Sequence, residues 1–390
     1  MIPVPDAAGL LPPPLSLYVH LPWCVRKCSY CDFNSHAVKG EIPADEYIDA
    51  LFRDLEQDLP LAWGRTVQTV FFGGGTPSLF SAAQVERMLS GFRGLLNIAP
   101  GAEVTLEANP GTTERDSFSA YRAAGINRVS LGVQSFDDRM LRAIGRIHGR
   151  SEVERALDSI SRSGIGNFNL DLMYALPGQS LESAVEDMRL ALAAEPSHLS
   201  HYQLTLEPNT AFHARPPPLP AEDLAWAMQE ACAELLEDAG FGNYEISAWA
   251  RPGQACRHNL NYWEYGDFLA IGAGAHGKVT LGAGQEVRRR VKRRHPRAWM
   301  DGAMRGDVLA EDRTVSAPER IFEFFLNQSR LKGGIRKSQF SPRTGLPWSD
   351  VEERVDLAVG KGLLEDRGSR LAPTALGWRF VNEIQAIFLP

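Results

Sequence analysis

The chain has 390 residues, a net charge of −7 and a composition that is 44% hydrophobic and 23% charged. That length allows about two to three domains of ~150 residues, and the composition is not that of a disordered protein. The negative charge argues against a protein that binds nucleic acid through bulk charge. Three of the five cysteines stand within residues 24–31, which indicates reduced thiols in a cytoplasmic protein rather than a disulfide framework.

The first twenty residues, MIPVPDAAGLLPPPLSLYVH, contain five prolines and lack both a basic start and a continuous apolar stretch. We therefore expect residues 1–15 to form a tail rather than a signal peptide. No run of about 18 apolar residues follows, so we expect no transmembrane helix, while peripheral membrane contact stays open.

Short apolar, β-branched runs then alternate with amphipathic stretches through the first half of the chain. The strand-like runs cover residues 16–22, 69–77, 103–110, 128–136, 168–178 and 198–208. The helix-like stretches between them cover residues 44–59, 82–96, 151–164 and 181–195. This alternation predicts a parallel sheet, because near-continuous apolar strands are typical of sheets covered on both faces.

We expect the six units to form an α/β fold, a partial (β/α)6 barrel over residues 16–215. A doubly wound open sheet is the alternative. Polar residues gather where the expected strands end: Gly73 to Thr76, Glu107, Asn109, Gln134, Asp171 and Thr205. Because the chemistry of β/α barrels lies at the carboxyl ends of their strands, this edge is the expected site.

The pattern changes after the proline-rich stretch RPPPLP at residues 215–220. We expect residues 216–309 to form a linking region that begins with a helix over 221–240, ended by Gly240. Its basic run RRRVKRRHPR (288–297) is interpreted as a solvated strand or loop rather than a nucleic-acid site. The pattern of residues 310–390 predicts a smaller C-terminal α/β domain, mostly helical and similar to a winged helix. We interpret this domain as packing or a lid rather than a DNA-binding module.

The cysteines have the spacing Cys24-x3-Cys28-x2-Cys31, directly after the first expected strand. A structural zinc site takes four protein ligands, and His20 or His36 would have to complete such a site here. A [4Fe–4S] cubane takes one thiolate per iron, so three cysteines leave one iron open. That iron can bind the amino and carboxylate groups of S-adenosylmethionine (SAM), which accounts for three thiols without a fourth.

The three-cysteine motif after a first strand resembles the radical SAM superfamily. Further stretches narrow the resemblance: LYVHLPWCVRKCSYCDFNSH, FFGGGTPSL, SLGVQSF, NLDLMYALPGQ and HNLNYW. Together they are similar to the oxygen-independent coproporphyrinogen III dehydrogenase family and, within it, to the HemW-type haem chaperones. The resemblance extends from about residue 16 to residue 385.

This resemblance implies SAM contacts along the strand ends. They fall on Tyr18, Tyr30, the backbone of Gly74, Gly75 and Thr76, the side chains of Glu107, Gln134, Arg146 and Asp171, and the backbone positions Thr205 and His276. Glycines suit this role because they allow close backbone approach. Arg146 is expected at a SAM carboxylate, and Glu107 at the ribose hydroxyls or the sulfonium. For Glu107 and Asp171, a structural cap or ion pair is the alternative.

The HNLNYW motif contains His258, Tyr262 and Trp263. The resemblance implies that it handles haem, because imidazole is a natural axial ligand and aromatic side chains suit a flat macrocycle. His258 is the expected ligand and His276 the second candidate. A core histidine packed among aromatics is the alternative.

Two departures decide between the members of the family that the chain resembles. The oxidase-type enzymes carry a fourth cysteine two residues after the third, where this chain has Phe33, and they have a longer N-terminal segment. Both departures favour a haem chaperone that binds a [4Fe–4S] cluster, SAM and haem and passes haem to an acceptor, such as a respiratory cytochrome or a haem enzyme. The alternatives are oxidative decarboxylation of coproporphyrinogen III and a radical SAM reaction on an unrelated substrate. Monomer and dimer both stay open.

Overall fold

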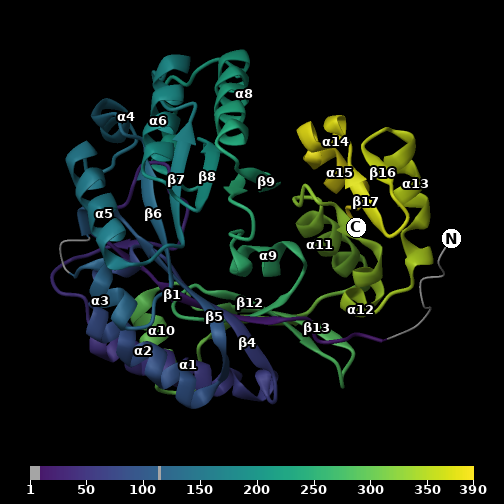
Figure 1. Cartoon of the computed structure of the whole chain (residues 1–390). Helices are drawn as coiled ribbons and strands as arrows, with labels where there is room; N and C mark the ends of the chain where they lie inside the picture. The colour runs from purple at the N-terminus through teal and green to yellow at the C-terminus, as the bar shows by residue number, and fades with distance from the viewer. Residues whose placement is uncertain (1–8, 113–115) are drawn as a thin grey trace.

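The computed structural model describes residues 9–112 and 116–390, and a long curved sheet forms its centre (Figure 1). Six strands run in chain order and parallel to one another: β1 (Leu15–Leu21), β4 (Thr66–Gly74), β5 (Asn97–Ala108), β6 (Arg128–Gln134), β7 (Phe168–Tyr174) and β8 (His198–Gln203). Each strand pairs with its predecessor and the order never reverses. The structure therefore confirms the six expected βα units and not a doubly wound sheet, whose strand order turns back at its centre.

Helices follow the strands and lie along the outer side of the curved sheet (Figure 1). They are α1 (Ala44–Ala62), α2 (Ala82–Leu95), α3 (Phe118–Ala123), α4 (Asp138–Ala143), α5 (Arg150–Ser163) and α6 (Leu181–Ala193). Local sequence sets their ends. Ser81 and Gln84 form a reciprocal capping box at the start of α2, and Gly164 ends α5 with a left-handed φ of 76°. Strand β6 is buried along its whole length, as a strand covered on both faces must be.

The sheet continues beyond both edges of the parallel region. On one side β11 (Asp267–Ile271) pairs parallel with β1 and leads to three antiparallel strands, β12 (His276–Leu281), β13 (Glu286–Lys292) and β14 (Leu309–Thr314). On the other side β8 is followed by the short antiparallel strands β10 (Ala248–Ala250) and β9 (Gly242–Glu245). The strand order thus begins at β14 and ends at β9. The region expected as a linker between residues 216 and 309 therefore contributes five strands, β9 to β13, to the sheet, and β14 begins at its last residue.

Helix α7 (Ala211–Ala214) precedes this region, which contains the helices α8 (Glu222–Asp238), α9 (Arg257–Trp263) and α10 (Pro296–Ala303). The expected helix over 221–240 is confirmed as α8, and Gly240 follows it with a φ of 80°. Helix α9 carries the HNLNYW motif and contacts β1, β4 and β11 as well as the C-terminal unit.

The basic run 288–297 occupies β13, the loop after it and the start of α10 (Pro296–Ala303). The expectation that this run is solvated is wrong for two of its residues. Lys292 is 1% exposed and bonds to Asp58 (2.9 Å) and Asp54 of α1, and Arg290 pairs with Asp58. Acidic residues inside the protein therefore neutralise part of the run, because a buried charge needs a partner.

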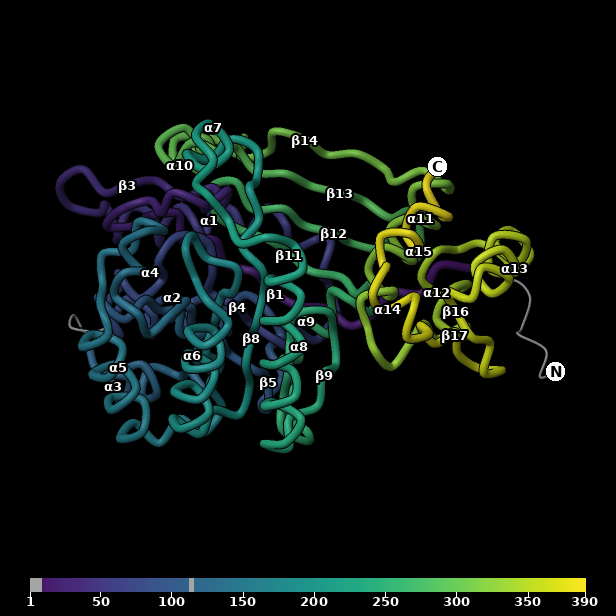
Figure 2. Tube along the Cα trace, turned by 90° about the horizontal axis from the view of Figure 1, so that it is seen from above, coloured from purple at the N-terminus to yellow at the C-terminus, as the bar shows by residue number. Residues whose placement is uncertain are grey.

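The C-terminal residues form a unit with its own core, which lies beside the sheet in Figure 2. It contains α11 (Ala317–Gln328), α12 (Phe340–Thr344), α13 (Glu352–Gly360), α14 (Ala375–Arg379), α15 (Val381–Ile387) and the antiparallel strands β15 (Ile335–Arg336), β17 (Arg370–Pro373) and β16 (Leu364–Asp366). Aromatic rings fill the core, and the Phe325 and Phe388 rings stack with centroids 3.5 Å apart. Helices with a small antiparallel sheet agree with the winged-helix-like fold expected here.

The expected domain boundaries at residues 15, 215 and 309 stay predictions. Residues 1–8 of the expected N-terminal tail lie outside the described residues, whereas Leu10 is buried against Val287 and Val315. Within residues 9–112 and 116–390, every helix is too short or too polar to cross a membrane.

Candidate functional site

A loop between β1 and α1 carries the three clustered cysteines. The short strands β2 (Trp23–Cys24) and β3 (His36–Ala37) pair in parallel and close its base. Its tip is tied to the barrel, because the Ser29 amide donates to the Ile144 carbonyl and the Phe212 amide donates to the Ser29 carbonyl. Contacts to two neighbouring elements thus fix the tip of the loop, which contains no helix or strand between β2 and β3.

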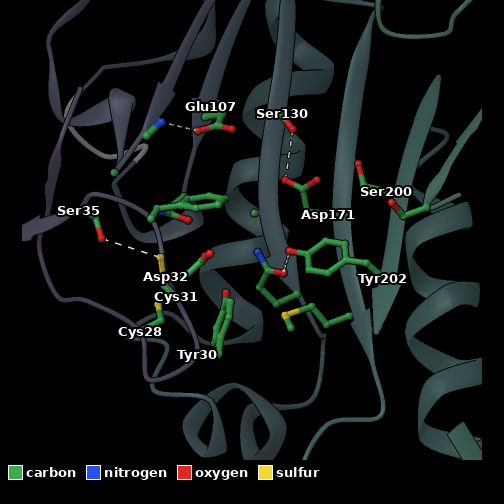
Figure 3. A pocket seen from close by; sticks show the side chains of 18 of the residues that line it. Cys28, Tyr30, Cys31, Asp32, Ser35, Glu107, Ser130, Asp171, Ser200 and Tyr202 are labelled. Carbon is green, nitrogen blue, oxygen red and sulfur yellow. Dashed lines mark hydrogen bonds between the residues drawn. The ribbon is translucent and has the colours of Figure 1, made fainter. Parts of the chain in front are cut away.

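The three thiols are half-buried, and each lies beside a different polar group. Thr76 donates its hydroxyl to the Cys24 Sγ at 3.5 Å, and the Arg146 guanidinium donates to the Cys28 Sγ at 3.5 Å. The Cys31 Sγ lies 3.9 Å from the Ser35 hydroxyl (Figure 3). Burial raises the pKa of the Cys24 and Cys31 thiols. Bonding to a metal would offset that cost, because a coordinated thiol is deprotonated.

The glycine-rich end of β4 packs directly against this loop. A Cβ on Gly75 would lie 2.5 Å from the Trp23 carbonyl oxygen, and one on Gly74, whose φ is 116°, would strike the His20 ring. The Gly75 amide donates to the Leu21 carbonyl and the Thr76 amide to the Trp23 carbonyl. Glycine is therefore required here so that two backbones can approach closely.

This packing changes the expected role of GGGTP. The amides of Gly75 and Thr76 are bonded within the protein, and the Gly74 amide donates to the Glu107 carboxylate at 3.1 Å. The amides of these three residues are therefore not available to SAM, which corrects the expectation that their backbone groups bind it.

Two carboxylates, Glu107 on β5 and Asp171 on β7, lie inside the barrel on either side of β6. Burial, with the charge of Asp171 as a second cause, raises the pKa of Glu107 to about 7. Asp171 accepts hydrogen bonds from Asn169 (2.7 Å) and Ser130 (3.2 Å), yet burial still raises its pKa. Figure 3 shows both carboxylates turned toward the space between the strands. A cationic ligand there would compensate them, because an opposite charge favours the ionised carboxylate.

Arg146 connects the rim to the cysteine loop. Its guanidinium donates to the Asn109 side chain at 2.9 Å and to the Gly132 carbonyl at 2.5 Å, in addition to Cys28. Within the described residues, its buried Nε has no hydrogen-bond partner. Buried polar atoms are rarely left unpaired, so this Nε is suited to an anionic ligand group.

Gln134 ends β6 with a φ of 69°, a left-handed conformation that is uncommon for a residue with a side chain. It is 5% exposed, and its side-chain oxygen accepts a hydrogen bond from the Tyr202 hydroxyl at 2.8 Å. Backbone strain of this kind gathers at binding and catalytic sites, which agrees with the position of Gln134 at the rim.

The three thiols, the glycine-rich strand end, the two carboxylates, Arg146 and Gln134 all line one cavity of about 460 Å³. Figure 3 shows the cysteine loop on one side of it and Ser200 and Tyr202 of β8 on the other. The expected site residues that line the cavity are Cys24, Cys28, Tyr30, Cys31, Gly74, Gly75, Thr76, Glu107, Gln134, Arg146, Asp171 and Thr205. The structure thus brings together all three thiols and nine of the twelve other expected residues.

Tyr18, His258 and His276 do not line this cavity. The Tyr18 hydroxyl bonds to the His20 ring at 3.0 Å, and His276 lies exposed at the start of β12. Tyr18 therefore sits behind the glycine-rich rim, and His276 sits on β12, in the antiparallel part of the sheet.

His258 requires a correction. It is 1% exposed, its Nδ1 bonds to the Thr69 hydroxyl at 2.7 Å, and its Nε2 bonds to the Tyr262 hydroxyl at 2.9 Å. Its ring also stacks on Phe71 with centroids 4.9 Å apart. Because both ring nitrogens are occupied, His258 has no atom left for iron in this arrangement. It is the satisfied core histidine that stood as the alternative.

Several lining residues were not among those expected to bind the cluster or SAM. Ser200 and Tyr202 alternate along β8, a period-two signal that HLSHYQ does contain. Trp263 of the HNLNYW motif lies under the guanidinium of Arg330, 4.3 Å from the ring centroid. Both also line the cavity. No sequence signal links residues 263 and 330, because only the docking of the C-terminal unit brings them together.

The donor set suits a cubane better than a single metal ion. In the described chain, no three His, Cys, Asp or Glu side chains converge on one ion position, whereas a cubane binds each thiolate to a separate iron. Cys232 and Cys256 are buried elsewhere and bond to the Ala184 carbonyl and to Glu103. Three thiols, two buried carboxylates and an unpaired guanidinium nitrogen around one cavity therefore fit a cluster with an open iron and a ligand that carries both charges.

The parallel half-barrel with a three-cysteine loop after its first strand defines a protein of the radical SAM class. In agreement, the family model described as "Radical SAM superfamily" matches residues 18–191, and the one described as "HemN C-terminal domain" matches residues 315–380. A solved structure of coproporphyrinogen III oxidase (HemN) from Escherichia coli, described as a radical SAM enzyme, has the same fold, with a TM-score of 0.82 at 24% identity over 98% of this chain and 91% of that one. This class implies a [4Fe–4S] cluster and SAM.

Relatives that align over nearly the whole chain identify its family within this class. The chain is 49% identical to "Heme chaperone HemW" of Escherichia coli (strain K12) over 377 residues, which cover 97% of this chain and 98% of that protein. It is 46% identical to the protein of the same name from Haemophilus influenzae over 381 residues, 97% of this chain and 98% of that protein. The chain belongs to the HemW family.

Proposed function

We propose that the protein is a haem chaperone, which binds haem as cargo and transfers it to an acceptor protein. The observation that carries this proposal is 49% identity over 97% of the chain to a relative named for that activity. The chain's own residues support it at one position. Phe33, which is 58% exposed, occupies the place of the fourth cysteine of the oxidase-type enzymes that the chain resembles.

We further propose that Cys24, Cys28 and Cys31 hold one [4Fe–4S] cluster and that SAM binds beside it in the same cavity. The thiols supply one ligand each to three irons, and the fourth iron stays open for SAM. Arg146 is placed to bind the SAM carboxylate through its unpaired Nε. Glu107 and Asp171 are placed to balance the positive charge of SAM, because both carboxylates line the cavity. When bound, the cluster supplies electron transfer to SAM.

The remaining parts of the proposal concern place and partners. Five free cysteines suit a reducing compartment, so we place the protein in the cytoplasm. The acceptor is a haem-dependent protein, such as a cytochrome or a haem enzyme.

A second function, oxidative decarboxylation of coproporphyrinogen III, is favoured by one observation. The thiols and strand-end polar groups form an intact cavity of the kind that a radical SAM enzyme needs. The missing thiol at residue 33 opposes it, because the resembling enzymes use a cysteine there.

The test is a haem titration of the protein after anaerobic reconstitution of its cluster, followed through the Soret band. Saturation near one haem per chain supports the chaperone, and transfer to an apo-haem protein would complete it. A protein that binds no haem but converts coproporphyrinogen III under reducing conditions would overturn the proposal in favour of the enzyme.

A further inference from the structure

A second cavity lies on the opposite face of β8 from the cysteine cavity. Side chains alternate along this strand, so Ser200 and Tyr202 face the first cavity while His201 faces the second. The second cavity has a volume of about 390 Å³, and α8, β9, β10 and the C-terminal helix α14 enclose it. It therefore lies where the C-terminal unit meets the edge of the sheet.

Aromatic side chains give this cavity flat walls. Trp226 of α8, Trp249 of β10 and Trp378 of α14 all line it. Trp226 leaves 38% of its surface exposed. Indole rings on three separate elements suit a flat, apolar ligand, and the exposed side suits a ligand that must leave again.

His201 provides an imidazole in the same wall. It is 8% exposed, and the Tyr174 ring packs against it with centroids 4.6 Å apart. Within residues 9–112 and 116–390, its ring makes none of the hydrogen bonds that occupy His20, His148, His198 and His258. Burial lowers the pKa of His201 to about 4, so its imidazole is neutral at pH 7 and keeps a lone pair for a metal.

Charged groups stand at the rim. The Lys332 ammonium lies over the Trp249 ring at 5.9 Å and, in the described parts of the chain, forms no ion pair. The Arg379 guanidinium lies over Trp226 at 4.7 Å and pairs with Glu230 at 3.2 Å. Glu237 also lines the cavity. Lys332 is thus the cation that is available to a carboxylate of the ligand.

We propose that this second cavity binds haem, with His201 as the axial ligand of its iron, the tryptophans against the macrocycle and Lys332 at a propionate. The inference rests on the proposed chaperone function and names the site where the cargo binds. It replaces His258, whose nitrogens are both bonded, with a histidine whose ring faces a cavity. It also places the haem site and the cysteine cavity on opposite faces of β8.

The experiment compares two porphyrins on one set of variants. Haem and metal-free protoporphyrin IX are titrated into the cluster-loaded protein and into His201→Ala, His258→Ala and His276→Ala. In His201→Ala the haem affinity should fall at least by the roughly 10- to 100-fold that loss of a supporting contact costs a metal site, and the Soret band of the imidazole-bound haem should shift. Metal-free protoporphyrin should bind His201→Ala as it binds the natural protein. The other two histidine variants should keep both affinities and the spectrum.

A tryptophan pair tests the walls. Trp226→Ala should weaken both porphyrins, whereas Trp63→Ala, which removes a tryptophan that is 86% exposed and outside the cavity, should weaken neither. Retention of the brown cluster absorbance shows in each variant that the barrel is folded.

The outcomes separate the inference from the function on which it rests. If the natural protein binds no haem, the chaperone proposal fails and this site with it. If the natural protein binds haem and His201→Ala keeps its affinity and spectrum, the chaperone proposal stands and this site is wrong. Loss of both porphyrins in His201→Ala, with the cluster retained, would overturn the role of His201 as an iron ligand.

Discussion

The hydroxyl of Thr76 donates to the Sγ of Cys24 at 3.5 Å, which joins the end of β4 to the first residue of the cysteine motif. Asn109 in turn donates to the same Thr76 oxygen at 2.8 Å, so the hydroxyl hydrogen is directed toward the sulfur. The contact spans 52 residues of sequence and depends on the close packing of the glycine-rich strand end against the loop. Donors to cysteine sulfur tune the reduction potential of iron–sulfur clusters.

Thr76→Val should therefore lower the reduction potential of the cluster without removing it. The donor stabilises the additional negative charge of the reduced cluster, and valine keeps the shape while removing the hydrogen. The expected shift is about 40 mV to lower potential, the one-electron equivalent of a hydrogen bond that contributes about 1 kcal/mol. Redox titration followed by electron paramagnetic resonance measures it. Thr76→Ser, which keeps the hydroxyl, should have the potential of the natural protein. Equal potentials in all three proteins would mean that this hydrogen bond does not affect the cluster.

Gly75→Ala should disturb the cysteine loop. The added Cβ would lie 2.5 Å from the Trp23 carbonyl oxygen and 2.8 Å from the Pro22 carbonyl carbon, both of them backbone atoms that cannot move aside alone. We expect a loss of about 1–3 kcal/mol in the free energy of unfolding and a low cluster content after reconstitution. Gly94→Ala in α2 is the matched control, because nothing lies within 4 Å of its added Cβ. It should keep the full cluster and gain about 0.5–1 kcal/mol. Equal iron contents in the two variants would contradict this account of the strand end.

Cys28→Ala should abolish the brown absorbance of the reconstituted protein, and Cys24→Ala and Cys31→Ala should do the same. A three-thiol site has no spare protein ligand in the described chain, since the two other cysteines are buried elsewhere. Cys232→Ala is the control, because Cys232 lies in α8 and bonds to the Ala184 carbonyl. Iron and sulfide analysis gives the result, and a stable cluster in any of the three motif variants would remove that thiol from the proposed ligands.

SAM affinity should rise with pH through the neutral range. The pKa of Glu107 is raised to about 7, so its carboxyl is mostly protonated below that pH and ionised above it. Only the ionised form attracts the cationic ligand, so the affinity should increase by up to about tenfold per pH unit below the midpoint. Equilibrium dialysis of the cluster-loaded protein between pH 6 and 8 measures it.

Two variants test whether Glu107 is the group that causes this pH dependence. Glu107→Gln should flatten the profile, since no carboxyl titrates there. Asp171→Asn should move the midpoint to lower pH, because the charge of Asp171 is one of the causes that raise the Glu107 pKa. A profile that stays unchanged in Glu107→Gln would assign the titration to another group.

Sequence periodicity predicted the parallel strands and the rim because both are local properties. A run such as RVSLGVQ is apolar throughout, so it indicates a buried strand wherever it lies, and the residue at its end falls at the carboxyl edge of the sheet. Gln134 and Glu107 were therefore placed correctly at one cavity without any knowledge of their neighbours, whereas Asp171 lines the same cavity from the middle of β7.

The parts that sequence did not predict depend on contacts between distant segments. Strands β11 to β14 extend the sheet, yet β13 reads as a basic run, because the acids that neutralise Lys292 lie in α1, more than 230 residues earlier. His258 was misassigned for the same reason. Its partner Thr69 stands 189 residues away, and a histidine with a distant hydrogen-bond partner looks the same in sequence as one that is open to a ligand.

His258→Ala should therefore be a stability variant and not a haem variant. It removes a ring that is 1% exposed and leaves the hydroxyls of Thr69 and Tyr262 without their shared partner. The free energy of unfolding at pH 7 should fall by about 2–4 kcal/mol, from lost packing and unpaired polar groups. Urea unfolding of the cluster-free protein measures this. His276→Ala, at an exposed position, is the control and should stay within about 0.5 kcal/mol of the natural protein.

The same variant should alter the response to acid. Burial lowers the pKa of His258 to about 3 in the folded chain, against an ordinary value of 6.5, so the unfolded chain takes up the proton first as the pH falls. The contribution of neutral His258 is complete above pH 6.5 and is lost toward pH 3, at about 1.4 kcal/mol per pH unit. The natural protein should therefore lose more stability between pH 7 and 5.5 than His258→Ala does. Equal losses would mean that His258 takes up its proton over the same pH range in the folded and the unfolded chain, so that burial does not lower its pKa.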